Sequence, residues 1–244
     1  PTARLRRGGG PVIPFARAFR ELSGVTFVGP DGNTQTVNEM LNTTYTDAWV
    51  VLKDGTIVAV GDAPEGASRT LDADGHTITP GFVDVHTHYD GQVSWDDVMD
   101  PSAGNGATTI VMGNCGVGFA PVRPGGEQTL IELMEGVEDI PGSAMTEGIT
   151  WEWESFPEYL DALERLPHAI DLAAQVPHCA VRTYVMGERG VKNEPATPED
   201  IAQMAAIVRE GIEAGAIGFS TSRTQLHRTR DGEVMPGTYA DEAE

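Results

Sequence analysis

Residues 80–90 read PGFVDVHTHYD, and this stretch decides how the rest of the chain is interpreted. A short apolar run leads directly into two histidines that are one residue apart. Side chains alternate between the two faces of a strand, so His86 and His88 point the same way and Thr87 points the other way. Two protonated imidazoles side by side would repel each other, whereas two neutral ones are a ready pair of metal ligands. The stretch predicts a strand whose end holds a metal if further ligands gather there.

After residue 80, apolar strand candidates alternate with amphipathic helix candidates, which implies a parallel sheet. The last helix is the clearest, because Thr197 can cap it, Pro198 fits its first turn and Gly215 stops it. A closed (β/α)8 barrel needs about 250 residues, so we predict a partial (β/α)8 TIM-type barrel with about its first four units. A doubly wound open sheet is the alternative, but no strand end carries its glycine fingerprint. The expected strands are 82–86, 108–112, 169–177 and 216–220, and the expected helices are 127–139, 156–166 and 198–214.

The residues before 80 have the pattern of a small β-domain. Residues 48–62, AWVVLKDGTIVAVGD, alternate well, and Asp54-Gly55 between the two halves predicts a tight hairpin. A short strand is expected at 24–28 and a third short run at 69–81. We therefore divide the chain into residues 1–79, an N-terminal segment with part of a small β-sandwich, and residues 80–244, the first half of the barrel.

The composition excludes several classes of protein. The chain has 244 residues, and its 37 acidic and 16 basic residues give a formal charge of -21, which argues against binding to nucleic acid or to anionic membranes. Two cysteines are too few for a disulfide framework and favour a reducing, cytoplasmic location. No apolar run approaches the roughly 20 residues that span a bilayer. Because the chain starts with Pro and stops where an acidic stretch opens a helix, we expect a fragment of a longer protein.

Cys115 lies in a glycine-rich loop just after the second expected strand, in TTIVMGNCGVGFAP (108–121). A structural cysteine would be expected within the strand, so this one is better placed to reach into a site. As a thiolate it would complete a mixed His/Cys zinc set with His86 and His88. The neighbouring glycines would let the backbone approach a ligand closely, although a role as turn residues fits equally well.

Other candidates lie at the later strand ends. His178, in QVPHCAVR (175–182), could be a metal ligand, a residue that contacts a metal ligand rather than the metal, a substrate contact or a hydrogen-bonded loop histidine. Arg223 belongs to a basic cluster, with His227, Arg228 and Arg230, that could receive a substrate carboxylate or could be a solvated loop. The remaining polar or sulfur-bearing candidates are expected to be structural or exposed: Cys179 buried, His76 and His168 structural, and the carboxylates of MEGVEDI (134–140) on an exposed helix face.

Together, PGFVDVHTHYDGQ (80–92) and GATTIVMGNCGVGFAPVRP (106–124) resemble the amidohydrolase superfamily and, more narrowly, its N-acyl-D-amino-acid deacylases (D-aminoacylases). The stretches 54–61, 72–81 and 176–187 agree, so the resemblance runs over residues 48–239, whereas residues 1–45 fit poorly. The paired histidines mark only the superfamily. The cysteine loop narrows the resemblance, since many relatives bridge their metals with a carboxylated lysine.

The resemblance implies a (β/α)8 barrel joined to a small β-sandwich, with one or two zinc ions at positions that match His86, His88 and Cys115. It implies zinc-dependent hydrolysis of small N-acyl-D-amino acids to a carboxylate and a D-amino acid, and it matches His178 to a recurrent histidine. Family members take further histidine ligands and a proton-shuttling aspartate from later strands. We therefore expect the general base beyond the end of this chain, and the chain alone to be inactive.

Two rival functions stay open. One is an amidohydrolase that acts on cyclic amides, like a hydantoinase or dihydroorotase, although such enzymes would prefer a lysine where this chain has GNCG (113–116). The other is a non-catalytic metal-binding or scaffold protein that has kept the histidines.

Overall fold

The computed structural model describes residues 26–28, 34–36, 49–53, 56–61, 66, 68, 81–138, 140–229 and 231–244. The chain forms two compact units, one before Gly81 and the other containing Gly81–Glu244. Three expectations lie outside the described residues: the third short run before residue 80, the structural role of His76, and the placement of Arg230.

The first unit contains two antiparallel strand pairs. Strands β1 (Thr26–Val28) and β2 (Thr34–Thr36) form one pair, in agreement with the short strand expected at 24–28. Strands β3 (Trp49–Lys53) and β4 (Thr56–Gly61) form the other, and Lys53 pairs with Thr56. Only Asp54-Gly55 separates these two residues, which confirms the predicted hairpin.

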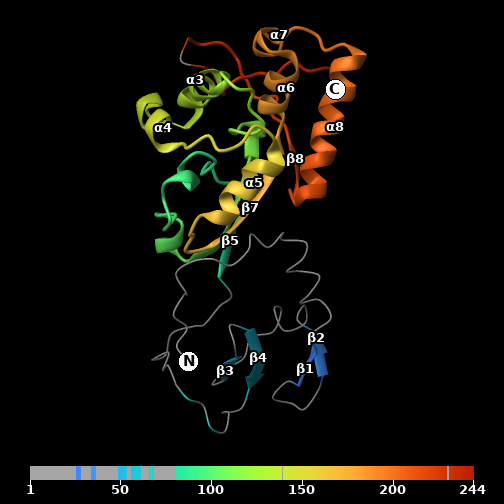
Figure 1. Ribbon diagram of the computed structural model, residues 1–244. Helices are drawn as coiled ribbons and strands as arrows, with labels where there is room; N and C mark the ends of the chain where they lie inside the picture. The colour runs from blue at the N-terminus through green and yellow to red at the C-terminus, as the bar shows by residue number, and fades with distance from the viewer. Residues whose placement is uncertain are drawn as a thin grey trace. The chain divides into compact units, whose positions relative to one another are not determined.

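The second unit is built on a four-stranded parallel sheet whose order follows the chain, β5-β6-β7-β8. A doubly wound sheet reverses its strand order, whereas a barrel does not. The sheet curls as one half of a (β/α)8 barrel, which confirms the predicted fold (Figure 1). Its strands are β5 (Phe82–Asp84), β6 (Ala107–Met112), β7 (Asp171–Pro177) and β8 (Gly218–Ser220).

Three helices lie where the sequence predicts them: α3 (Glu127–Glu138), α5 (Phe156–Arg165) and α8 (Pro198–Ala214). Thr197 caps α8 as expected, because its hydroxyl accepts a hydrogen bond from the Asp200 backbone and the Asp200 carboxylate accepts one from the Thr197 backbone. The helices α5 and α8 pack side by side (Figure 1).

The sequence did not predict the helices α4 (Gly142–Gly148), α6 (His178–Met186) and α7 (Glu188–Val191). In α6 most residues are buried, so no polar face alternates with an apolar stripe and the helical period is weak. The expectation for MEGVEDI is wrong at Glu135, which is half-buried and accepts a hydrogen bond of 3.1 Å from the Gly142 backbone at the start of α4. Three short turns complete the unit: η1 (Gln92–Ser94), η2 (Ala103–Asn105) and η3 (Asn114–Gly116).

An aromatic cluster joins the segment that follows Cys115 to α5. Phe119 packs edge-on against Trp151, with ring centroids 5.7 Å apart, and Trp153 packs edge-on against Tyr159 at 4.9 Å. The buried Trp153 indole N–H also donates a hydrogen bond of 2.9 Å to the Phe119 carbonyl. These contacts fix the segment after β6 against α5.

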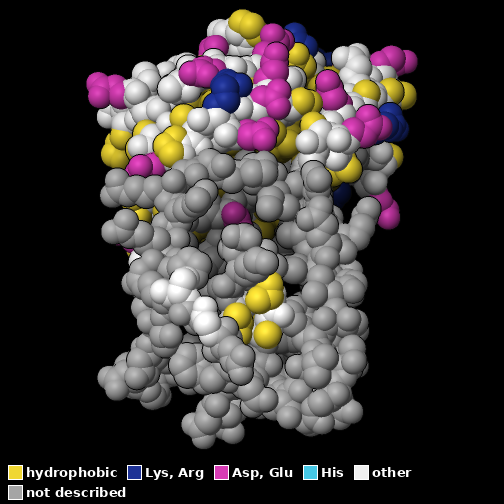
Figure 2. All heavy atoms as spheres, turned by 60° about the horizontal axis from the view of Figure 1, so that its bottom comes forward, with side chains coloured by type: hydrophobic (Ala, Val, Ile, Leu, Met, Phe, Trp, Pro, Cys, Tyr) yellow, Lys and Arg dark blue, Asp and Glu magenta, His cyan; other side chains and the backbone are white. Residues whose placement is uncertain are grey.

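On the face that Figure 2 displays, Asp and Glu side chains outnumber Lys and Arg side chains, in line with the formal charge of -21. Among the described residues, no helix combines the length and the apolar character that crossing a membrane requires.

Candidate metal centre

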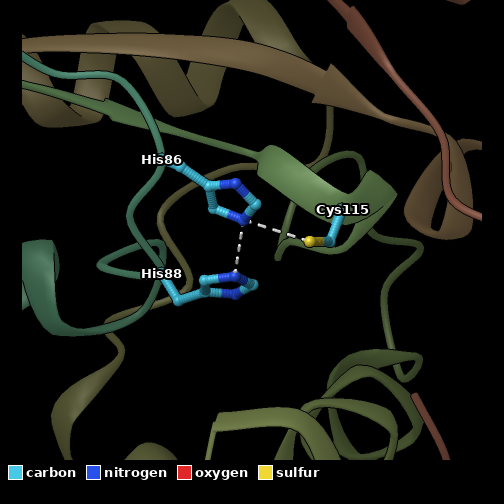
Figure 3. A group of neighbouring side chains, drawn as sticks. All are labelled: His86, His88 and Cys115. Atoms are coloured by element: carbon cyan, nitrogen blue, oxygen red, sulfur yellow. Dashed lines mark hydrogen bonds between the residues drawn. The ribbon is translucent and has the colours of Figure 1, made fainter. Parts of the chain in front are cut away.

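The segment after β5 presents His86 and His88 on the same side. Strand β5 ends two residues earlier than predicted, because the Asp84 carboxylate accepts a hydrogen bond of 3.3 Å from the His86 backbone and bends the chain. Thr87 points the opposite way, is buried, and donates hydrogen bonds to the Val111 carbonyl from both its backbone N–H (3.0 Å) and its hydroxyl (2.8 Å). With Thr87 anchored to β6, both imidazoles project toward the cysteine loop, and His86 contacts both His88 and Cys115 (Figure 3).

The ligand atoms of His86, His88 and Cys115 all lie within 4.8 Å of one another. His86 Nε2 is 3.1 Å from Cys115 Sγ and 3.3 Å from His88 Nε2. Zinc bonds of 2.0–2.3 Å at tetrahedral angles would place neighbouring donors roughly 3.3–3.7 Å apart. Two imidazoles and one thiol are also the donor types that zinc prefers. The three residues therefore fit a zinc ion.

Cys115 reaches the histidines from an unusual backbone conformation. Its φ of 58° lies in the left-handed region, which residues other than glycine rarely adopt. Such a residue carries about 1–3 kcal/mol of strain and persists only where its surroundings hold it. Gly113 and Gly116, on either side, also have positive φ values, of 78° and 71°. These three positive-φ residues within four positions turn the loop so that Cys115 Sγ faces His86 (Figure 3).

Side chains from neighbouring strands hold the cysteine loop. Asn114 donates hydrogen bonds to the carbonyls of Val85 (3.2 Å) and Val111 (2.9 Å), and it accepts one from Gln175 on β7 (2.9 Å). The hydroxyl of Ser220, at the end of β8, donates to the Gly113 carbonyl. All four strand ends thus contribute to the placement of Cys115.

The electrostatic surroundings of Cys115 suit a cation. Partial burial raises the pKa of its thiol, and the negative charge of Asp90 raises that pKa further. Asp90 is itself buried, and its backbone carbonyl accepts a hydrogen bond from Tyr159. A bound dication would reverse this effect, since a coordinating thiol is deprotonated by its metal.

Comparisons with known proteins agree with this geometry. A sequence profile described as the amidohydrolase family matches residues 69–244, well over half of the chain. The chain belongs to the amidohydrolase family. Among its relatives, a D-aminoacylase of Alcaligenes xylosoxydans xylosoxydans is 36% identical over 166 residues, 68% of this chain and 31% of the relative. An N-acyl-D-aspartate deacylase of the same organism is 33% identical over 173 residues, 70% of this chain and 32% of the relative.

Solved structures give the same picture. A crystal structure of D-aminoacylase, described as defining a novel subset of amidohydrolases, matches with a TM-score of 0.60 and 29% identity, over 86% of this chain and 40% of that one. The N-acyl-D-glutamate deacylase of Bordetella bronchiseptica, solved with zinc and a phosphonate inhibitor, matches with a TM-score of 0.53 and 30% identity, over 71% of this chain and 34% of that one. The chain spans about a third of the length of these curated relatives.

The structure places the other candidates as follows. His178 is the first residue of α6 rather than part of a loop, and it is buried with hydrogen bonds at both ring nitrogens. Arg223 is exposed after β8, close enough for its charge to lower the pKa of His178. Cys179 is buried as predicted, and burial raises its pKa to about 12. His168 is half-buried and lies 3.1 Å from the Val93 carbonyl, in agreement with a structural role.

A small cavity of about 10 Å3, close to the space that one water molecule needs, lies beside Cys115. His178, Thr221 and His227 also line it. Thr221 was not among the candidates predicted from the sequence, although it directly follows β8 at the carboxyl edge of the sheet, where barrel active sites lie. Glu244 was not predicted either, because it contacts His178 from a position 66 residues away and no local signal links the two.

Proposed function

We propose that the protein is a zinc-dependent amidohydrolase that cleaves the amide bond of N-acyl-D-amino acids, releasing a carboxylate and a D-amino acid. The observation that carries this proposal is the convergence of the donor atoms of His86, His88 and Cys115 within 4.8 Å at the carboxyl edge of the sheet. The D-aminoacylase and the N-acyl-D-aspartate deacylase among its relatives support the choice of substrate. The zinc in the N-acyl-D-glutamate deacylase structure supports the choice of metal.

In this proposal His86, His88 and Cys115 hold the zinc. The metal would polarise the amide carbonyl and lower the pKa of a water molecule toward neutrality. The chain's own residues set the electrostatics around it: the Cys115 thiolate would offset part of the metal's charge, and the buried Asp90 adds a second negative charge nearby. The exposed Arg223, on the loop after β8, is our candidate for the substrate carboxylate, to which a guanidinium can donate two hydrogen bonds.

Zinc content tests the site. Purified wild-type protein, supplied with zinc and then desalted, should carry near-stoichiometric metal by elemental analysis. His86→Ala and Cys115→Ala should carry much less, because each removes one of three donors. Cys179→Ala is the matched control, since this second free cysteine is buried in the core and is not one of the three clustered donors. A folded wild-type protein without zinc, or equal zinc in all four proteins, would refute the proposed site.

Substrate preference, measured on the whole protein because we expect this chain alone to be inactive, separates the three functional classes. Release of free amine from N-acetyl-D-amino acids, with little from the L-forms, is the expected result. Ring opening of a hydantoin without cleavage of N-acetyl-D-amino acids would favour the cyclic-amide alternative. Stoichiometric zinc with no turnover of either compound would favour the non-catalytic metal-binding alternative.

A further inference from the structure

A buried ion pair connects through His178 to a hydroxyl at the edge of the candidate site. Arg182 and Glu244 form the pair, and each side chain is only 2% exposed. Glu244 Oε1 also lies 3.0 Å from His178 Nε2. The other ring nitrogen, His178 Nδ1, lies 2.8 Å from the hydroxyl oxygen of Thr221. These contacts form one continuous series that runs from the ion pair to Thr221.

The donors and acceptors in this series have one consistent assignment. The Glu244 carboxylate is paired with Arg182 and accepts the hydrogen bond at its contact with His178, so His178 Nε2 carries a proton. Burial lowers the pKa of His178, against the opposing effect of Glu244, so the ring is neutral at neutral pH. The Nδ1 atom of a neutral ring protonated at Nε2 is an acceptor. Thr221 must therefore donate its hydroxyl proton to His178.

Thr221 stands between this buried series and the candidate metal centre. It is exposed, whereas His178 is buried, and both line the cavity beside Cys115. A Cβ added to Gly116 would lie 2.8 Å from Thr221 Cα, so the threonine packs directly against the cysteine loop. With its proton committed to His178, the Thr221 oxygen retains only lone pairs and can only accept.

We infer that Thr221 accepts a hydrogen bond from the N–H of the substrate amide. In this inference His178 is a positioning residue: it accepts the hydroxyl proton of Thr221, so that the lone pairs of the threonine oxygen face the substrate. The inference rests on the proposed function, because it assumes an amide substrate at this site. An amide N–H is a donor that a pure acceptor can recognise. An ester analogue, with oxygen in place of that N–H, offers only lone pairs and would be repelled.

The test compares an N-acetyl-D-amino acid with the matching O-acetyl 2-hydroxy acid on the zinc-loaded protein. The affinity, measured by calorimetry, and kcat/KM are each determined for both compounds, and each is expressed as the value for the amide divided by the value for the ester. Thr221→Val keeps the shape and removes the hydroxyl, so it should lower this ratio roughly 3- to 10-fold, the effect of one neutral hydrogen bond. Thr221→Ser should restore the ratio. Thr224→Val is the matched control, because Thr224 lines the same cavity but its hydroxyl accepts a hydrogen bond from the Leu226 backbone, whereas His178 Nδ1 contacts Thr221.

His178 is tested by its tautomer and by substitution. Nitrogen NMR of the imidazole should find the proton on Nε2 and none on Nδ1, and His178→Gln should lower the amide-to-ester ratio in the same direction as Thr221→Val. A proton on Nδ1, or equal losses for amide and ester in Thr221→Val, would overturn the inference. If the whole wild-type protein hydrolyses neither compound, the proposed function fails. The affinity ratio from calorimetry then decides separately whether Thr221 accepts a hydrogen bond from the substrate N–H.

Discussion

Alanine at Gly116 should disturb the candidate metal centre through the backbone alone. Gly116 has a φ of 71°, and a Cβ there would lie 2.8 Å from Thr221 Cα, 3.2 Å from the Ser220 carbonyl oxygen and 3.2 Å from the Ser222 nitrogen. All three atoms belong to the backbone, so no side chain can rotate away. The substitution must push the loop after β8 and the cysteine loop apart.

Gly125→Ala supplies the reference. Gly125 has a φ of 84°, yet an added Cβ would meet nothing within 4 Å. Both alanines carry the left-handed backbone cost of about 1–2 kcal/mol, which cancels in the comparison. The remaining difference is the cost of overpacking, about 1–3 kcal/mol. Gly116→Ala should therefore be less stable than Gly125→Ala by that amount.

Urea unfolding followed by tryptophan fluorescence measures the difference, because Trp151 and Trp153 lie in the packed core of the same unit. Zinc affinity is the second readout and should fall in Gly116→Ala only, since Cys115 is the adjacent residue. Equal free energies of unfolding for the two variants, together with equal zinc affinities, would refute the reasoning that contact between these loops positions Cys115.

Two further perturbations probe the packing around the site. Burial holds the pKa of His178 below its ordinary value of 6.5, so the unfolded chain takes up the proton first as the pH falls. The stability that His178 contributes is therefore complete above pH 6.5 and is lost as the pH falls toward the folded-state pKa. Between pH 7.5 and 5.5 the His178→Gln variant should lose less stability than the wild type. Parallel pH profiles of the two proteins would contradict this. Thr197→Ala removes the cap of α8 and should cost about 1 kcal/mol in urea unfolding, against little for Gln203→Ala on the exposed face; equal effects would contradict the capping role.

Local signals in the sequence account for much of the fold. The Asp54-Gly55 turn predicted the β3–β4 hairpin, and Thr197, Pro198 and Gly215 predicted both ends of α8, because turns and caps depend on residues only a few positions apart. The pairing of His86 and His88 was equally predictable, since side chains alternate along an extended chain. The position of Cys115 just after a strand indicated its approach to them, because parallel strands end at a common edge.

Only the tertiary structure decided the rest. Helix α6 has no amphipathic pattern because the packing buries most of its surface, and the left-handed φ of Cys115 depends on hydrogen bonds from other strands. Glu244 contacts His178 across 66 residues, and His178 contacts Thr221 across 43. No residue near any of these in the sequence indicates its partner. Such contacts arise when the sheet brings separate strand ends to one edge, so the sequence identified the three candidate metal ligands, whereas the packing determined what surrounds them.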